Sequence, residues 1–240
     1  ITGADPVAAW ARHTGRIHRA AADWPVDQLL VDGRAMTLAR FPNAGGDPYK
    51  PLTVEMTAAE LNVAAASLDQ PKDFFKGATL WVIGQRKWVA GTARVVTSDR
   101  GALTLDSKVP FWSQGVGWGR LEGTLALLDA EREWCQHEGA LYLWAPGGAD
   151  PNSLRVEATQ RRWAFDLSGR SHVQIAGLRI VAASANLDNA EACLVERCRF
   201  RWPGLNRDIR GGFNRDKGLG GASEGLGIAV DLGTTTLVAQ

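Results

Sequence analysis

A repeat of twenty residues between Trp163 and Trp202 constrains the fold of this 240-residue chain more than any other feature. When the two halves of this stretch are overlaid, four pairs coincide: Val173 with Cys193, Ile175 with Val195, Leu178 with Cys198, and Ile180 with Phe200. The apolar residues alternate with polar ones, which is typical of a strand with one buried face. A strand unit repeated at this length indicates a solenoid, whose rungs bury their faces against one another. We therefore predict an all-β chain built on a right-handed parallel β-helix.

The rest of the chain divides around this repeat. Residues 1–25 are predicted to form the first strand or cap of the β-helix. Residues 26–145 are predicted to form an inserted, small antiparallel β module near the N-terminus, and residues 146–240 the coils of the β-helix. The strand pattern is still running at Gln240, so we expect the chain to be the N-terminal portion of a longer protein.

Turn signals are clearest within residues 26–145. Asp32-Gly33 separates two apolar runs and suits a hairpin turn whose two central residues have positive φ. Further apolar runs separated by short polar turns predict a small antiparallel sheet or barrel; they cover 78–83, 88–96 and 102–105. Two other stretches, 56–68 and 120–128, have a composition or spacing that favours a short helix.

Composition excludes several classes of function. A net charge of +1 leaves no basic excess to neutralise phosphates, so nucleic acid is not expected to be the main partner. No apolar run approaches the roughly 18 residues of a membrane span, and no signal peptide is visible. Cys193 and Cys198 fall on inward positions of the repeat and are expected to be core residues. Cys135 and His137 are spaced too closely for a usual zinc site, so we expect neither metal nor cofactor.

Three segments resemble β-helical glycoside hydrolases and related polysaccharide-degrading enzymes, such as the β-helical α-galactosidases and the fucosidase- or xylanase-like group. The segments are Gln28–Asn43 (QLLVDGRAMTLARFPN), Leu125–Trp134 (LALLDAEREW) and Gly139–Trp144 (GALYLW). The resemblance covers about residues 24–202. In those enzymes a small β-rich module interrupts the helix near its N-terminal end. This sequence departs from them at Glu131-Arg132, where they have Pro-Gly.

The resemblance implies a function for the whole protein. It predicts the N-terminal part of a glycoside hydrolase, or a polysaccharide lyase, acting on polysaccharide or oligosaccharide in a secreted or periplasmic location. Carbohydrate is then the expected partner, with no nucleic acid and no membrane. The catalytic acids of the family usually lie on later coils, so no catalytic residue is carried over. We expect the 240-residue chain itself to be inactive.

A Gly- and Arg-rich loop from Pro203 to Gly225 offers the candidate site residues. Glycoside hydrolysis normally uses two carboxylates about 5–10 Å apart. The candidate catalytic acids in this loop are Asp208, Asp216 and Glu224, and the candidate substrate-binding residues are Arg207, Arg210 and Arg215. Other acids have structural roles in this interpretation. Asp166 is expected at a corner of the coil, and Glu196 is expected to point outward.

Two alternatives to the hydrolase remain open. The first is a non-catalytic β-helix that binds carbohydrate or serves in adhesion. The second is a nucleotide-binding fragment, because residues 227–236 (GIAVDLGTTT) resemble the first phosphate loop of the actin, heat-shock chaperone and sugar-kinase superfamily. The same segment also overlays the coil that contains Asp166, so we expect it to form a further rung.

Overall fold

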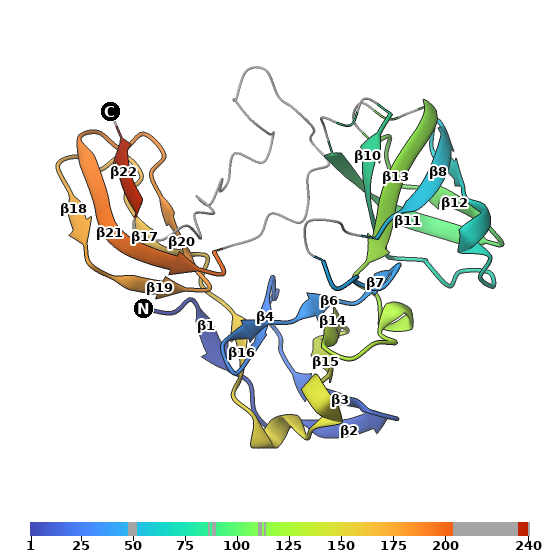
Figure 1. The fold of residues 1–240 in the computed structure, drawn as a ribbon, viewed down its shortest axis with the longest axis horizontal. Coiled ribbons are helices and arrows are strands. Elements are labelled where there is room, and N and C mark those ends of the chain that lie inside the picture. Colours follow the sequence, from blue (N-terminus) through green and yellow to red (C-terminus); the bar gives the residue numbers. More distant parts are fainter. Residues whose placement is uncertain are drawn as a thin grey trace.

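In the computed structural model of this chain, the described residues are all-β, with four short 3₁₀ turns between their strands. It describes residues 1–47, 52–85, 87, 90–109, 112, 114–203 and the backbone of 235–239. Figure 1 shows three regions, which are a barrel, a central pair of sheets, and a group of strands that carries the C-terminal end of the chain. Within the described residues, no helix is long and apolar enough to cross a membrane.

Six antiparallel strands close into the barrel at the upper right of Figure 1. They are β8 (Val54–Ala59), β9 (Asn62–Ala64), β10 (Thr79–Gly84), β11 (Ala90–Asp99), β12 (Ala102–Leu105) and β13 (Gln114–Glu122). Their order is β10-β11-β12-β9-β8-β13, and the pairing of β13 with β10 closes the ring. A short strand, β7 (Arg40–Phe41), adds to β13, and the turn η1 (Ala66–Leu68) follows β9.

Alternating small residues on β13 shape the interior of the barrel. Gly117 and Gly119 are buried, whereas Trp118 between them lies at the outer surface. A Cβ on Gly117 would lie 2.6 Å from the ring of Trp112, which is only 3% exposed. The absence of side chains on these glycines therefore leaves the space that the indole ring of Trp112 fills, and this ring completes the packing of the barrel core.

Two sheets form the centre of the molecule. One comprises β2 (Ala11–Thr14), β3 (Ile17–Ala21), β15 (Ala140–Trp144), β14 (Glu133–His137) and β6 (Thr37–Leu38). The other comprises β1 (Ala4–Pro6), β16 (Val156–Thr159), β4 (Leu29–Val31) and β5 (Arg34–Ala35). Three turns, η2 (Leu125–Leu127), η3 (Pro146–Gly148) and η4 (Pro151–Ser153), flank these strands. The predicted hairpin at Asp32-Gly33 is confirmed, because the two residues have φ of 49° and 72° and join β4 to β5.

The third region contains the repeat. Its strands are β17 (Trp163–Asp166), β18 (Gln174–Ala176), β19 (Arg179–Val181), β20 (Ser184–Asn186), β21 (Cys193–Arg201) and β22 (Thr235–Ala239). The pairing predicted from the sequence is confirmed at two positions, since Ile175 lies opposite Val195 and Ile180 opposite Phe200 in parallel register. Cys193 and Cys198 are buried, as expected for core residues.

The prediction of a right-handed parallel β-helix is wrong. The largest sheet is a closed antiparallel barrel, and the central sheets are antiparallel or mixed. The segments expected to form further rungs also pair differently, since β16 is antiparallel to β1 and β4, and β22 is antiparallel to β21. A period seen once specifies one set of parallel pairs, whereas a solenoid needs at least three stacked repeats.

The two predicted helices are also wrong. Residues 56–68 form most of β8, then β9 and η1, and residues 120–128 form the end of β13 and η2. In β8 buried and exposed residues alternate strictly, which is the pattern of a strand with one buried face. Closing the barrel therefore outweighs the helical preference of the alanine-rich sequence.

Candidate functional site

The six site residues predicted from the sequence cannot be placed. Asp208, Asp216, Glu224, Arg207, Arg210 and Arg215 lie outside the described residues, and they stay predictions. Residues 227–234 of the segment that resembles a phosphate loop also lie outside them. Its last two residues, Thr235 and Thr236, belong to β22.

Two other acids can be placed. One oxygen of the Asp166 carboxylate accepts hydrogen bonds from the backbone N–H and hydroxyl of Ser168 and from the side chain of Asn186, at 2.7–3.0 Å. These donors lower the pKa of Asp166. The expected corner of a β-helix coil is wrong together with the β-helix, and Asp166 instead ends β17 beside the turn at Ser168-Gly169. Glu196 lies at the surface, where it accepts a hydrogen bond from Gln174 and pairs with Arg197, so its outward orientation is confirmed.

Aromatic and charged side chains meet on the outer surface of the barrel. Ile83 on β10, Trp118 on β13 and Glu55 on β8 lie directly opposite one another across the three strands. Trp81 on β10 lies opposite Arg120 on β13, one outward position along. We call these five residues the tryptophan face. Both tryptophans are half-buried, which leaves part of each indole ring in contact with solvent.

Hydrogen bonds and cations fix the two indole rings. The Trp118 Nε1–H donates to Glu55 Oε2 at 3.2 Å, and Lys87 Nζ lies 4.4 Å from the ring centroid. The Arg120 guanidinium lies 4.7 Å from the Trp81 ring, and its Nε–H donates to Glu122 Oε2 at 2.9 Å. Cations at these distances are attracted to the face of the ring. The tryptophan face thus combines flat apolar surface with donors and acceptors of hydrogen bonds.

A groove of about 600 Å³ adjoins the tryptophan face. It runs over the outer surface of β8, β9, β12 and β11, where the outward side chains are small. The groups available to a ligand are hydroxyls, one amide and two charges; they belong to Thr57, Thr97, Thr104, Asn62, Lys72 and Asp99. Glu55 of the tryptophan face and Thr57 of the groove are two residues apart on the outward side of β8, so the groove begins beside the tryptophan face.

A solved structure named a glycoside hydrolase is similar in fold. The TM-score is 0.58 and the sequence identity is 13%, over 75% of this chain. This chain spans 36% of the length of that protein. No protein-family model matches the sequence, and no curated protein matches it. At this identity the likeness shows the fold alone.

Away from the tryptophan face and the groove, the carboxylate of Glu133 at the start of β14 is buried and has a shifted pKa. The residue is 2% exposed, and burial raises its pKa to about 7, with a further contribution from the negative charge of Asp129. Nearby backbone N–H groups offset part of this increase, but within the described residues no group meets hydrogen-bond geometry with either oxygen. Burial, and then the charge of Glu133, raises the pKa of Cys135 to about 12, so this thiol stays protonated at neutral pH. Both groups are enclosed and cannot reach a ligand.

Sequence reasoning did not find the tryptophan face. Trp81 and Trp118 each stand between two buried residues, so alternation could have shown that they face outward. Their proximity depends on the pairing of β10 with β13, which no local pattern reveals.

Among the described residues, no three His, Cys, Asp or Glu side chains are grouped so that they could hold a metal ion.

Proposed function

We propose that this chain is the N-terminal part of a carbohydrate-active enzyme of the glycoside hydrolase type, and that the tryptophan face and the adjoining groove bind the sugar chain. The observation that carries the proposal is the placement of two half-buried indole rings beside Glu55 and Arg120. Indole rings offer the flat apolar surface that the apolar faces of sugars require, and the charged groups can bond to hydroxyls. The fold of the solved glycoside hydrolase supports this class of ligand.

Hydrolysis is the second half of the proposal. It normally uses two carboxylates that flank the scissile bond, and the tryptophan face contributes one, Glu55. The predicted acids Asp208, Asp216 and Glu224 would have to supply the chemistry. The same geometry equally suits a surface that holds carbohydrate without cleaving it, which is the second candidate function. A secreted or periplasmic location fits either function and stays a proposal.

Substitution of Trp118, one of the two half-buried tryptophans, tests the binding surface. Trp118→Ala should weaken the binding of neutral xylo- and galacto-oligosaccharides by about tenfold, which corresponds to about 1.4 kcal/mol. Tryptophan is enriched among the binding residues whose truncation costs this much or more. Isothermal titration calorimetry measures the change. The matched control is Trp163→Ala, which removes another half-buried tryptophan with an arginine on its face, 4.9 Å away, in the third region. Equal losses in both variants, or no binding by the unaltered protein, would contradict the proposal.

An activity assay separates the two candidate functions. The 240-residue chain and the longer protein of which we propose it to be a part are each incubated with plant and microbial polysaccharides, and the reducing ends released are counted. Turnover by the longer protein favours the hydrolase, and binding without turnover favours the non-catalytic alternative. We expect no turnover by the 240-residue chain itself. Turnover that disappears in Asp208→Asn or Glu224→Gln would show that expectation to be wrong.

A further inference from the structure

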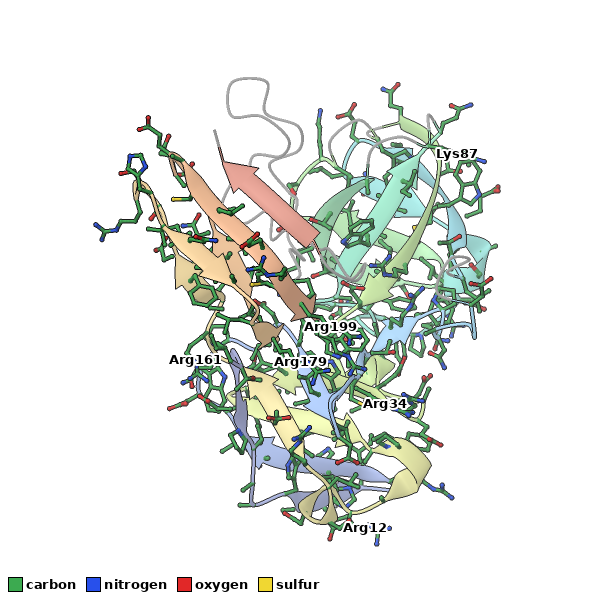
Figure 2. The ribbon with its side chains drawn as sticks, turned by 60° about the vertical axis from the view of Figure 1, so that its left-hand side comes forward. Arg12, Arg34, Lys87, Arg161, Arg179 and Arg199 are labelled. Atoms are coloured by element: carbon green, nitrogen blue, oxygen red, sulfur yellow. The ribbon has the colours of Figure 1, made fainter. Side chains whose placement is uncertain are left out.

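Four exposed arginines gather where the third region meets the central sheets. Arg179 on β19 and Arg199 on β21 lie directly opposite each other in parallel register, and Arg201 follows on the same side of β21. Arg34 belongs to the hairpin between β4 and β5. We call these four residues the arginine patch. Figure 2 shows Arg34, Arg179 and Arg199 in one part of the molecule and Arg12 at its far lower end.

Packing holds the hairpin against the end of β21. The Trp202 Nε1–H donates to the carbonyl oxygen of Gly33 at 3.0 Å, which joins segments 169 residues apart. Ala35 and Val181 pack with Trp202 around a small buried cluster. Arg34 stands between Gly33 and Ala35, so this contact fixes it beside the two strands that carry the other arginines.

The fold does not explain why these charges are together. Within the described residues, none of the four guanidinium groups has an acidic partner at ion-pair distance. Other arginines do, including Arg155 with Glu157, Arg161 with Asp5 and Arg197 with Glu196. Like charges directly opposite each other on neighbouring strands destabilise a sheet. An arrangement that opposes stability without a structural return points to a ligand.

The chemistry of the patch selects the ligand. Neighbouring strands lie about 4.8 Å apart, so Arg179 and Arg199 present two planar forks that can each hold a carboxylate through two hydrogen bonds. Half-buried Trp202, with the Arg201 guanidinium 5.5 Å from its ring, adds an apolar surface beside these charges. We propose that the arginine patch binds an acidic glycan that carries uronate carboxylates. Nucleic acid suits the patch less well, because the chain as a whole carries a net charge of only +1.

A charge-matched pair of variants tests this site, using a linear oligogalacturonate of ten sugars as the probe. Arg179→Gln with Arg199→Gln should weaken its binding at 50 mM salt at least tenfold in calorimetry. The control is Arg12→Gln with Arg19→Gln, which removes the same charge from the β2–β3 hairpin and should change the affinity less than twofold. Urea unfolding should show both variants folded, because all four side chains are exposed.

Several results would overturn the proposal. They are equal loss in both variants, no binding by the unaltered protein, or tighter binding of a ten-nucleotide single-stranded DNA than of the glycan. The arginine patch lies on β19, β21 and the hairpin of β4 and β5, whereas the tryptophan face lies on the barrel. Binding of the acidic glycan at the arginine patch can therefore be tested independently of sugar binding at the tryptophan face. A neutral xylo-oligosaccharide of equal length reports any charge-independent contribution.

Discussion

At the scale of single residues, the buried carboxylate of Glu133 shows how environment sets chemistry. Its pKa is about 7 because burial removes water from the charged form and Asp129 adds a like charge. In the unfolded chain the same group has its usual pKa of 4.5. The folded state therefore holds a proton that the unfolded state releases between these two values. The stabilisation by this proton is present in full below pH 4.5 and is lost as the pH rises through 7.

Glu133→Gln should abolish most of this dependence. A shift of about 2.5 pKa units corresponds to roughly 3 kcal/mol, so the unaltered protein should lose about that much free energy of unfolding between pH 4.5 and pH 8. The variant should change far less over this range and be the more stable protein at pH 8. Urea unfolding at a series of pH values measures the difference. Glu138→Gln, at a side chain that is 83% exposed, is the control. If the free energy of unfolding of Glu133→Gln changed with pH as much as that of the unaltered protein, this carboxyl would titrate normally.

At the scale of elements, the glycines of β13 decide whether the barrel can close. A Cβ on Gly119 would lie 2.4 Å from the carbonyl oxygen of Trp81, which is backbone and cannot move aside. Gly119→Ala should lower the free energy of unfolding by about 1–3 kcal/mol or more, since overpacking forces the strands apart. Denaturant titration followed by tryptophan fluorescence measures it. Gly46→Ala adds the same methyl group where nothing lies within 4 Å and should have little effect. Similar losses in the two variants would disprove the close approach.

The elements also show what the sequence could predict. The strand at Ala102–Leu105, the hairpin at Asp32-Gly33 and the register of Ile175 with Val195 all follow from local alternation or turn chemistry. Closure of the barrel does not, because the pairing of β10 with β13 joins residues about forty positions apart. The tryptophan face depends on the same pairing, and for that reason it could not be predicted. The β-helix was wrong because a single repeat does not specify what its neighbours pair with.

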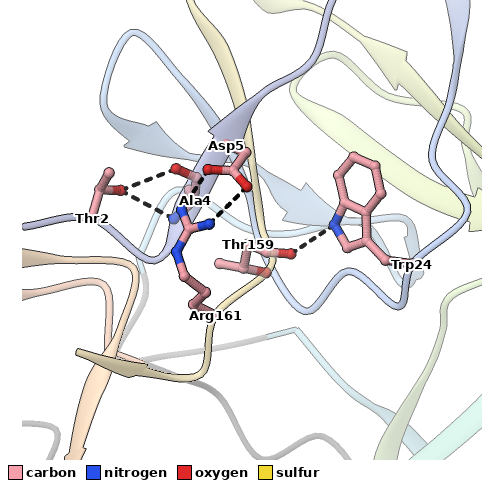
Figure 3. A network of polar contacts seen from close by, with 6 residues as sticks. All are labelled: Thr2, Ala4, Asp5, Trp24, Thr159 and Arg161. Atoms are coloured by element: carbon pink, nitrogen blue, oxygen red, sulfur yellow. Dashed lines mark hydrogen bonds and ion pairs between the residues drawn. The ribbon is translucent and has the colours of Figure 1, made fainter. Parts of the chain in front are cut away.

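At the scale of the whole molecule, distant segments are joined across the second sheet. β1 pairs with β16, and Thr2 pairs with Val181 in the third region, so residues near the start of the chain link two regions. Figure 3 shows the polar contacts at this junction. Asp5 pairs with Arg161 through both carboxylate oxygens at the surface, and the Trp24 Nε1–H donates to the carbonyl oxygen of Thr159 at 3.1 Å. Strand pairing, an ion pair and side-chain hydrogen bonds thus all act at one place.

The hydrogen bonds of Thr159 should matter more than the ion pair. Its buried hydroxyl accepts from the backbone N–H groups of Asp27 and Gln28, at 3.1 Å and 2.9 Å. Thr159→Val keeps the shape of the side chain but leaves both donors without a partner, which should cost about 2–4 kcal/mol of unfolding free energy. Asp5→Asn breaks a solvent-screened pair and should lower the melting temperature much less. Calorimetric melting of both variants ranks the two contacts. A larger loss in Asp5→Asn would mean that the surface ion pair contributes more to stability than the buried hydroxyl.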